Sequence, residues 1–193
     1  MFTIFDSSAF GNPKKWNASS NDTFNWPRLI HLTWQTYSDD YELQSEEDCL
    51  IKPEGFELDY EFEDKHHVKQ EELVNKGQDL KTVLEKFAKV VNDSSYLISH
   101  NLRYNENIVA AEFYRKSINH RLPQSEKYCL MMECTYLCKL PNKRGGYKWP
   151  SLIELHLKCF GEKYERMHHA LEDVRAAGRC YTFLMKNDYL DLF

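Results

Sequence analysis

Two acidic side chains and one histidine, far apart in the sequence, are of the types that metal-dependent hydrolysis uses. Asp6 follows the apolar run Phe2–Phe5, and Asp173 lies five residues after His168. Carboxylates are preferred ligands of Mg²⁺, and a histidine near a bound water can take up its proton. This set of residue types is therefore compatible with metal-assisted activation of a water molecule.

A third polar segment follows another apolar run. His100 and Asn101 come directly after Tyr96–Ser99, and Tyr104 and Asn105 follow shortly. Taken singly, such residues more often form turns and loop hydrogen bonds than sites. Because strand ends and helix starts converge on one cleft in α/β folds, we expect all three segments to share a pocket.

Hydrophobic patterning predicts the elements that position these segments. Strands are expected at 2–5, 29–35, 46–51, 96–99 and 127–131, and helices at 79–92, 105–119, 133–139, 151–160 and 168–186. A long surface loop is expected at 7–28, and a charged region with one short helix at 54–77. This order predicts an α/β fold with a mixed sheet whose first three strands are antiparallel.

Composition limits the class of protein. The chain has 193 residues, of which 42% are hydrophobic, enough for a single domain over 1–193 with a proper core. The net charge of −5 argues against a non-specific DNA coat, whose affinity comes from neutralising phosphates. The apolar runs are too short to cross a bilayer, and the N-terminus lacks the pattern of a signal peptide. We expect a cytoplasmic protein with no membrane partner.

The six cysteines include no Cys-x-x-Cys pair, so a structural zinc site has little support. Cys134 and Cys138 are four residues apart and could hold a metal together with His156. Buried thiols in a reducing compartment are the favoured interpretation.

The three polar segments, in order, resemble the motifs of the DEDDh (DnaQ-like) 3′–5′ exonucleases, the family of the proofreading subunit of bacterial DNA polymerase III. The family's motifs are Asp-x-Glu-Thr-Thr-Gly, His-Asn-x-x-Phe-Asp and His-x-Ala-x-x-Asp. Their counterparts are Asp6–Gly11, His100–Asn105 and His168–Asp173. The resemblance runs from Phe2 to about Lys186. It implies a ribonuclease H-like mixed five-stranded sheet flanked by helices, in one DEDDh exonuclease-like domain.

Carried over residue by residue, the resemblance implies a weakened metal site. Asp6 and Asp173 match metal-binding acids and His168 matches the general base, but Ser8 and Asn105 occupy the other two acid positions. The resemblance further implies a substrate-contacting set of Ser8, Ala9, Phe10, His100, Asn101 and Tyr104. Asp-to-Asn is a change that experimenters also introduce to trap complexes. Ala9-Phe10 in place of Thr-Thr departs from the pattern too, which favours natural drift.

The resemblance implies phosphodiester hydrolysis with two divalent ions, which clamp the attacking and leaving oxygens. Two carboxylates offset only half of the charge of two such ions, and neutral oxygens bind a hard cation less strongly than anions do. The leading hypothesis is a degenerate family member that binds 3′ ends of single-stranded DNA or RNA, or a protein partner. It would hold at most one weakly bound Mg²⁺ or Mn²⁺, or none. The rival is an active 3′–5′ exonuclease with an altered metal site and His168 as base. The third alternative is a protein-interaction module.

A basic segment interleaved with aromatic residues is the main candidate for strand binding outside the motifs. Lys143, Arg144, Tyr147 and Lys148 are the candidate residues, with Lys139 and Trp149 beside them. Cations and aromatic rings together hold single strands by charge and stacking. A solvated loop is an equally weighted alternative. Lys14-Lys15-Trp16 in the early loop is a weaker candidate.

Overall fold

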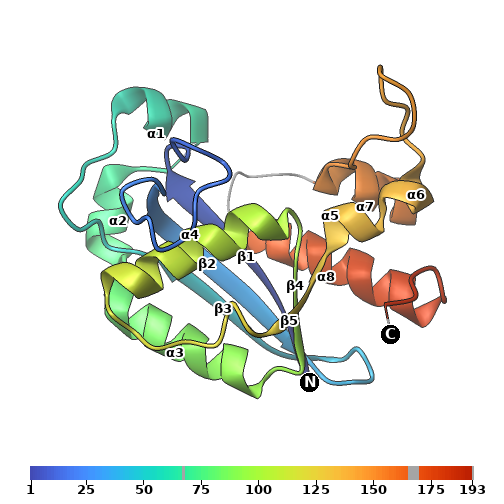
Figure 1. Cartoon of the computed structure of the whole chain (residues 1–193), viewed down its shortest axis with the longest axis horizontal. Coiled ribbons are helices and arrows are strands. Elements are labelled where there is room, and N and C mark those ends of the chain that lie inside the picture. Colours follow the sequence, from blue (N-terminus) through green and yellow to red (C-terminus); the bar gives the residue numbers. More distant parts are fainter. Residues whose placement is uncertain (67, 165–169, 193) are drawn as a thin grey trace.

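One mixed sheet forms the centre of the molecule in the computed structural model, which describes residues 1–66, 68–164 and 170–192. Its strands are β1 (Phe2–Phe10), β2 (Arg28–Tyr37), β3 (Leu43–Leu50), β4 (Tyr96–Ser99) and β5 (Glu126–Cys129). They lie in the order β3-β2-β1-β4-β5 (Figure 1). β1, β2 and β3 pair antiparallel, whereas β4 runs parallel to β1 and to β5. The predicted mixed five-stranded α/β fold is confirmed.

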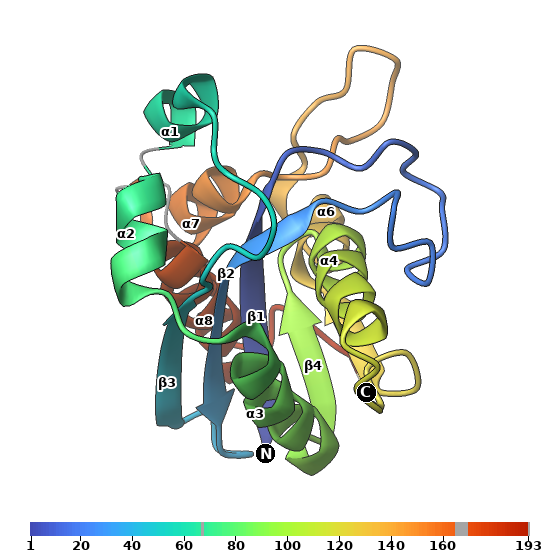
Figure 2. The same cartoon turned by 90° about the vertical axis from the view of Figure 1, so that its left-hand side faces the viewer.

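Helices cover both faces of the sheet. Figure 2 looks onto one face, with α3 and α4 in front of the strands and α8 behind them. One face carries α3 (Leu80–Asp93) and α4 (Leu102–Arg115), and the other carries α5 (Leu130–Glu133), α7 (Leu152–Phe160) and α8 (Ala170–Lys186). The short helices α1 (Tyr60–His66), α2 (Gln70–Lys76) and α6 (Thr135–Cys138) lie outside these two layers. Within the described residues, no helix has the length and apolar character that crossing a membrane requires.

Strand alternation divides the side chains of β1 between two cores. Phe5 and Ala9 pack into the cluster beneath α3 and α4. Phe2 and Ile4 pack into the cluster beneath α7 and α8. Asp6 stands two residues after Ile4 and therefore faces the side of the sheet that α8 covers.

Several predicted boundaries were wrong for local reasons. β1 continues to Phe10 instead of ending after Phe5, because Asp6, Ser7 and Ser8 still pair with β2. The early loop is correspondingly shorter, and the polar residues of the first motif lie on a strand. The helix expected at 133–139 is divided into α5 and α6 at Cys134. The charged region 54–77 contains two short helices, not one.

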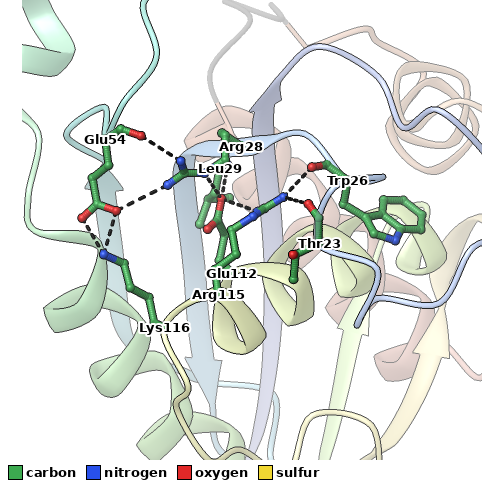
Figure 3. A network of polar contacts seen from close by, with 8 residues as sticks. All are labelled: Thr23, Trp26, Arg28, Leu29, Glu54, Glu112, Arg115 and Lys116. Atoms are coloured by element: carbon green, nitrogen blue, oxygen red, sulfur yellow. Dashed lines mark hydrogen bonds and ion pairs between the residues drawn. The ribbon is translucent and has the colours of Figure 1, made fainter.

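A buried carboxylate ties α4 to β2 and to the early loop (Figure 3). The side chain of Glu112 is 0% exposed, and its Oε1 lies 2.9 Å from Arg28 Nε and 2.8 Å from Arg115 Nη1. The same oxygen accepts a hydrogen bond of 3.0 Å from the Leu29 backbone N–H. Arg115 in turn donates to the carbonyl oxygens of Thr23 and Trp26. The network fixes the end of the loop that leads into β2.

Candidate functional site

A cavity of about 340 Å³ opens where β1 and β4 approach the start of α4 and of α8. It is lined by Asp6, Ser7, Ser8, His100, Asn101, Tyr104, Asn105, Met131, Ser151, Leu152, Ile153, Tyr164 and Asp173. The structure thus brings residues of all three polar segments together. His168 lies outside the described residues.

Asn105 lies inside α4, because this helix begins at Leu102, three residues earlier than expected. Asn101 adopts a left-handed conformation with φ of 62°, which an asparagine tolerates better than most residues. The helix therefore starts at Leu102, and Asn105 lies in its first turn. Its side chain is buried against β1 and β4, where each of its polar atoms requires a hydrogen-bond partner.

The amide of Asn105 uses all its polar atoms on the protein itself. Nδ2 donates to Asp6 Oδ1 at 2.7 Å, to Ser99 Oγ at 2.7 Å and to the His100 carbonyl at 3.1 Å. Oδ1 accepts a hydrogen bond of 2.8 Å from Ser7 Oγ. The contact with Asp6 is thus made by a neutral N–H donor. An acidic side chain at position 105 would repel the Asp6 carboxylate unless a cation lay between them.

Asp173 reaches the same cavity from the first turn of α8. Thr33 of β2 is paired with Asp6, and its hydroxyl donates a buried hydrogen bond of 3.0 Å to the Ala170 carbonyl. This bond anchors the described start of α8 over β1. Further along, Gly178 allows close approach to β2, since a Cβ there would lie 2.2 Å from Tyr37 Oη. Asp173 Oδ1 accepts a hydrogen bond of 2.5 Å from the Tyr164 hydroxyl.

Tyr104 forms a neutral wall of the cavity. Burial raises the pKa of its phenol to about 12, and the negative charge of Asp6 acts in the same direction. The hydroxyl therefore stays protonated at neutral pH and remains available as a hydrogen-bond donor. The ring also contacts Trp16 of the early loop, with ring centres 5.9 Å apart.

Other candidate residues lie away from this cavity. Ala9 is buried in the core beneath α3 and α4. Phe10 packs on Phe56 and Phe62, with ring centres 5.8 and 4.9 Å apart. Ala9 and Phe10 line a neighbouring cavity of about 450 Å³, which shares Tyr104 with the first. The candidates Lys143, Arg144, Tyr147 and Lys148 belong to a separate projection between α6 and α7.

The donor set does not fit a pair of divalent ions. Among the described residues that line the cavity, Asp6 and Asp173 are the only carboxylates. Each accepts a hydrogen bond from a neutral donor, Asn105 or Tyr164. Glu106, beside Asn105, forms an ion pair of 3.0 Å with Lys127. Two divalent ions bring four positive charges, and two carboxylates leave half of that charge without compensation.

The described residues also do not assemble any group of three or more His, Cys, Asp or Glu side chains that could hold a metal. The alternative site at Cys134, Cys138 and His156 is therefore not supported. The ring of His156 instead lies with Nδ1 2.9 Å from the Glu162 carbonyl. Burial raises the pKa of the Cys138 thiol to about 11, as expected for an unreactive thiol.

No protein-family model matches the sequence, and neither does any curated protein. Solved structures do match. E. coli exonuclease I in complex with a dT13 oligonucleotide has a TM-score of 0.74 at 15% identity, over 97% of this chain and 42% of that chain. The same enzyme with a dA16 oligonucleotide gives 0.73 at 14% identity, over 96% and 40%. A zinc-bound form of its complex with single-stranded DNA gives 0.73 at 14% identity, over 97% and 41%.

These likenesses establish the fold, which is that of ribonuclease H-like exonucleases. The chain spans less than half the length of the exonuclease I chains that it matches. Sequence reasoning missed Tyr164 and Thr33 of the site. Neither lies in a recognisable motif, and their contacts with Asp173 and Ala170 arise only in the folded chain.

Proposed function

We propose that this chain is a degenerate member of the DEDDh exonuclease family that binds 3′ ends of single-stranded DNA or RNA with weakened or lost hydrolytic activity. The fold and the cavity support the family assignment. The three polar segments follow one another in the sequence as the family's motifs do, and described residues of all three line the cavity. The oligonucleotide complexes of exonuclease I support a single strand as the ligand.

One contact carries the proposal about activity. The Asn105 amide donates to Asp6 Oδ1 at 2.7 Å, and Asn105 occupies the position where the second motif of the family has an aspartate. An amide N–H in that place satisfies the carboxylate and presents positive partial charge toward it. A metal ion bound to Asp6 Oδ1 would have to displace this hydrogen bond, and position 105 would supply no anionic ligand of its own. Hydrolysis that depends on two ions is therefore expected to be lost.

The second candidate is an exonuclease that works with an altered metal site. Its support is that Asp6 and Asp173 line one cavity and could share a single Mg²⁺ or Mn²⁺. In this alternative His168 would act as the general base, as the family motif implies. The two proposals predict different results for the Asp173→Asn variant: tighter binding of the strand in the first, and loss of hydrolysis in the second.

A binding and hydrolysis assay separates these proposals. We expect a labelled single strand to bind in EDTA, to bind equally with Mg²⁺, and to remain intact over hours. Asp173→Asn should tighten binding several-fold, because it removes a negative charge that faces the phosphates. The measurements are fluorescence anisotropy for affinity and gel electrophoresis for strand length.

The control is the same strand with its 3′ end base-paired in a duplex, which should bind at least tenfold more weakly. Shortening of the strand by the unmodified chain that disappears in Asp173→Asn would establish the active exonuclease instead. If the strand is neither bound nor shortened, a protein-interaction module becomes the better interpretation.

A further inference from the structure

The segment between α5 and α7 leaves the rim of the cavity and returns to it. Met131 before this segment and Ser151 after it both line the cavity. Between them the chain projects from the body of the molecule in both cartoon views (Figures 1 and 2). Both ends of the projection therefore lie at the rim of the cavity.

The projection is an ordered hairpin. Pro141 and Tyr147 form an antiparallel bridge, and the Lys148 N–H donates to the Leu140 carbonyl at 2.9 Å. The turn closes through the Asn142 N–H to the Gly146 carbonyl at 3.0 Å. Gly146 has a φ of 71°, a value that glycine adopts without strain. The backbone of the hairpin is therefore ordered by its own hydrogen bonds.

Large apolar side chains are exposed along the hairpin and the helix before it. Tyr136 is 76% exposed, Trp149 is 60% exposed and Tyr147 is 43% exposed. The rings of Tyr136 and Tyr147 meet edge to face, with centres 5.9 Å apart. None of the three rings belongs to a hydrophobic core cluster. Exposed apolar side chains that lie together, as Tyr136 and Tyr147 do, are typical of interaction surfaces.

The charge of the same surface is positive, although the chain as a whole is negative. From 134 to 153 the sequence contains four Lys or Arg residues and no Asp or Glu. Lys148 pairs with Glu154 at 2.5 Å. Across the part of the chain that the structure describes, no ion pair involves Lys139, Lys143 or Arg144. Three cations are thus left for an anionic partner.

We propose that this hairpin is a second contact surface for single-stranded nucleic acid, which holds the strand upstream of the 3′ end that enters the cavity. The inference rests on the proposed function and adds the path of the strand. Tyr136, Tyr147 and Trp149 stack on bases, while Lys143 and Arg144 neutralise phosphates. Aromatic rings among cations favour a single strand over an acidic peptide, because bases offer faces on which the rings stack.

Two oligonucleotide lengths test the proposal. A strand of about four nucleotides can place its 3′ end in the cavity with little length beyond it, whereas one of about 15 is long enough to extend along the hairpin as well. We expect the double variant Lys143→Glu with Arg144→Glu to lower the affinity for the longer strand at least tenfold and the affinity for the shorter one less than twofold. The slope of log affinity against log salt should fall by about 1.4 for the longer strand, for two lost phosphate contacts. The double variant Tyr136→Ala with Trp149→Ala should lower the affinity for the longer strand to a similar extent.

Lys89→Glu on α3 is the matched control, since Lys89 is exposed on the layer away from the hairpin. It should change neither affinity by more than twofold. Thermal melting confirms that each variant is folded, which these exposed positions should allow.

The outcomes distinguish the inference from the function on which it rests. Equal weakening of both lengths, or an effect of Lys89→Glu as large as that of the hairpin variants, would overturn the hairpin surface while leaving binding in the cavity intact. Binding of the longer strand alone, lost in the hairpin variants, would support the surface and contradict 3′-end capture in the cavity. Failure of both lengths to bind the unmodified chain would overturn both proposals.

Discussion

Combining Ser8→Glu with Asn105→Asp is expected to tighten Mn²⁺ binding by about 100-fold or more over the unmodified chain, equivalent to about 2.7 kcal/mol. The change adds two carboxylates to a cavity where Asp6 and Asp173 already lie. It also removes the amide that donates to Asp6 Oδ1. Calorimetric titration with Mn²⁺ measures the change.

The stability of the same variant provides a second observation. Without metal, the carboxylate introduced at position 105 would face Asp6 across the 2.7 Å that the Asn105 hydrogen bond now spans, and two carboxylates at that distance repel each other. The metal-free variant should therefore melt at a lower temperature than the unmodified chain, and Mn²⁺ should reverse the loss. Ser8→Gln alone is the matched control, because it adds the length of the glutamate side chain without its charge. An unchanged Mn²⁺ affinity in the double variant would contradict the assignment of Ser8 and Asn105 to the acid positions.

Replacing Glu112 by leucine should cost about 3–5 kcal/mol of the free energy of unfolding, the range for removing one partner of a buried ion pair. The Glu112 side chain is fully buried, and Arg28, Arg115 and the Leu29 N–H all converge on its Oε1 (Figure 3). The substitution leaves two arginines without their anionic partner. Urea unfolding followed by tryptophan fluorescence, to which the buried Trp34 contributes, measures the loss.

Glu54→Gln provides the comparison for this network. Glu54 contacts Arg28 and Lys116, but its side chain is 36% exposed. Because exposed ion pairs contribute little, this variant should lose less than about 1 kcal/mol. Similar losses in the two variants would show that Glu112 is not the centre of the network.

The convergence of Asp6, Asn105 and Asp173 was predictable from sequence because each lies close to a strongly patterned element. Apolar runs locate β1 and β4, and helical spacing locates α8. Parallel pairing of β1 with β4 then brings their carboxyl ends to one edge of the sheet. The order of the elements and the mixed sheet follow from the same patterns.

The remaining parts of the site depend on long-range contacts that no local pattern encodes. The hydrogen bond from Thr33 to the Ala170 carbonyl joins residues 137 positions apart. Tyr164 reaches Asp173 from a segment without periodicity. The extension of β1 through Asp6–Phe10 was missed because its polar residues, although paired with β2, break the apolar pattern. For residues 139–149 the sequence favoured a strand-binding segment and a solvated loop equally. It did not indicate the hairpin, because the bridge between Pro141 and Tyr147 has no local signal in the sequence.

The most direct test of the shortage of negative charge in the cavity is anomalous diffraction from crystals of the unmodified chain soaked in Mn²⁺. We expect at most one partly occupied Mn²⁺ peak, between the carboxylates of Asp6 and Asp173. Two fully occupied Mn²⁺ ions roughly 4 Å apart in that cavity would contradict the proposed loss of two-metal hydrolysis.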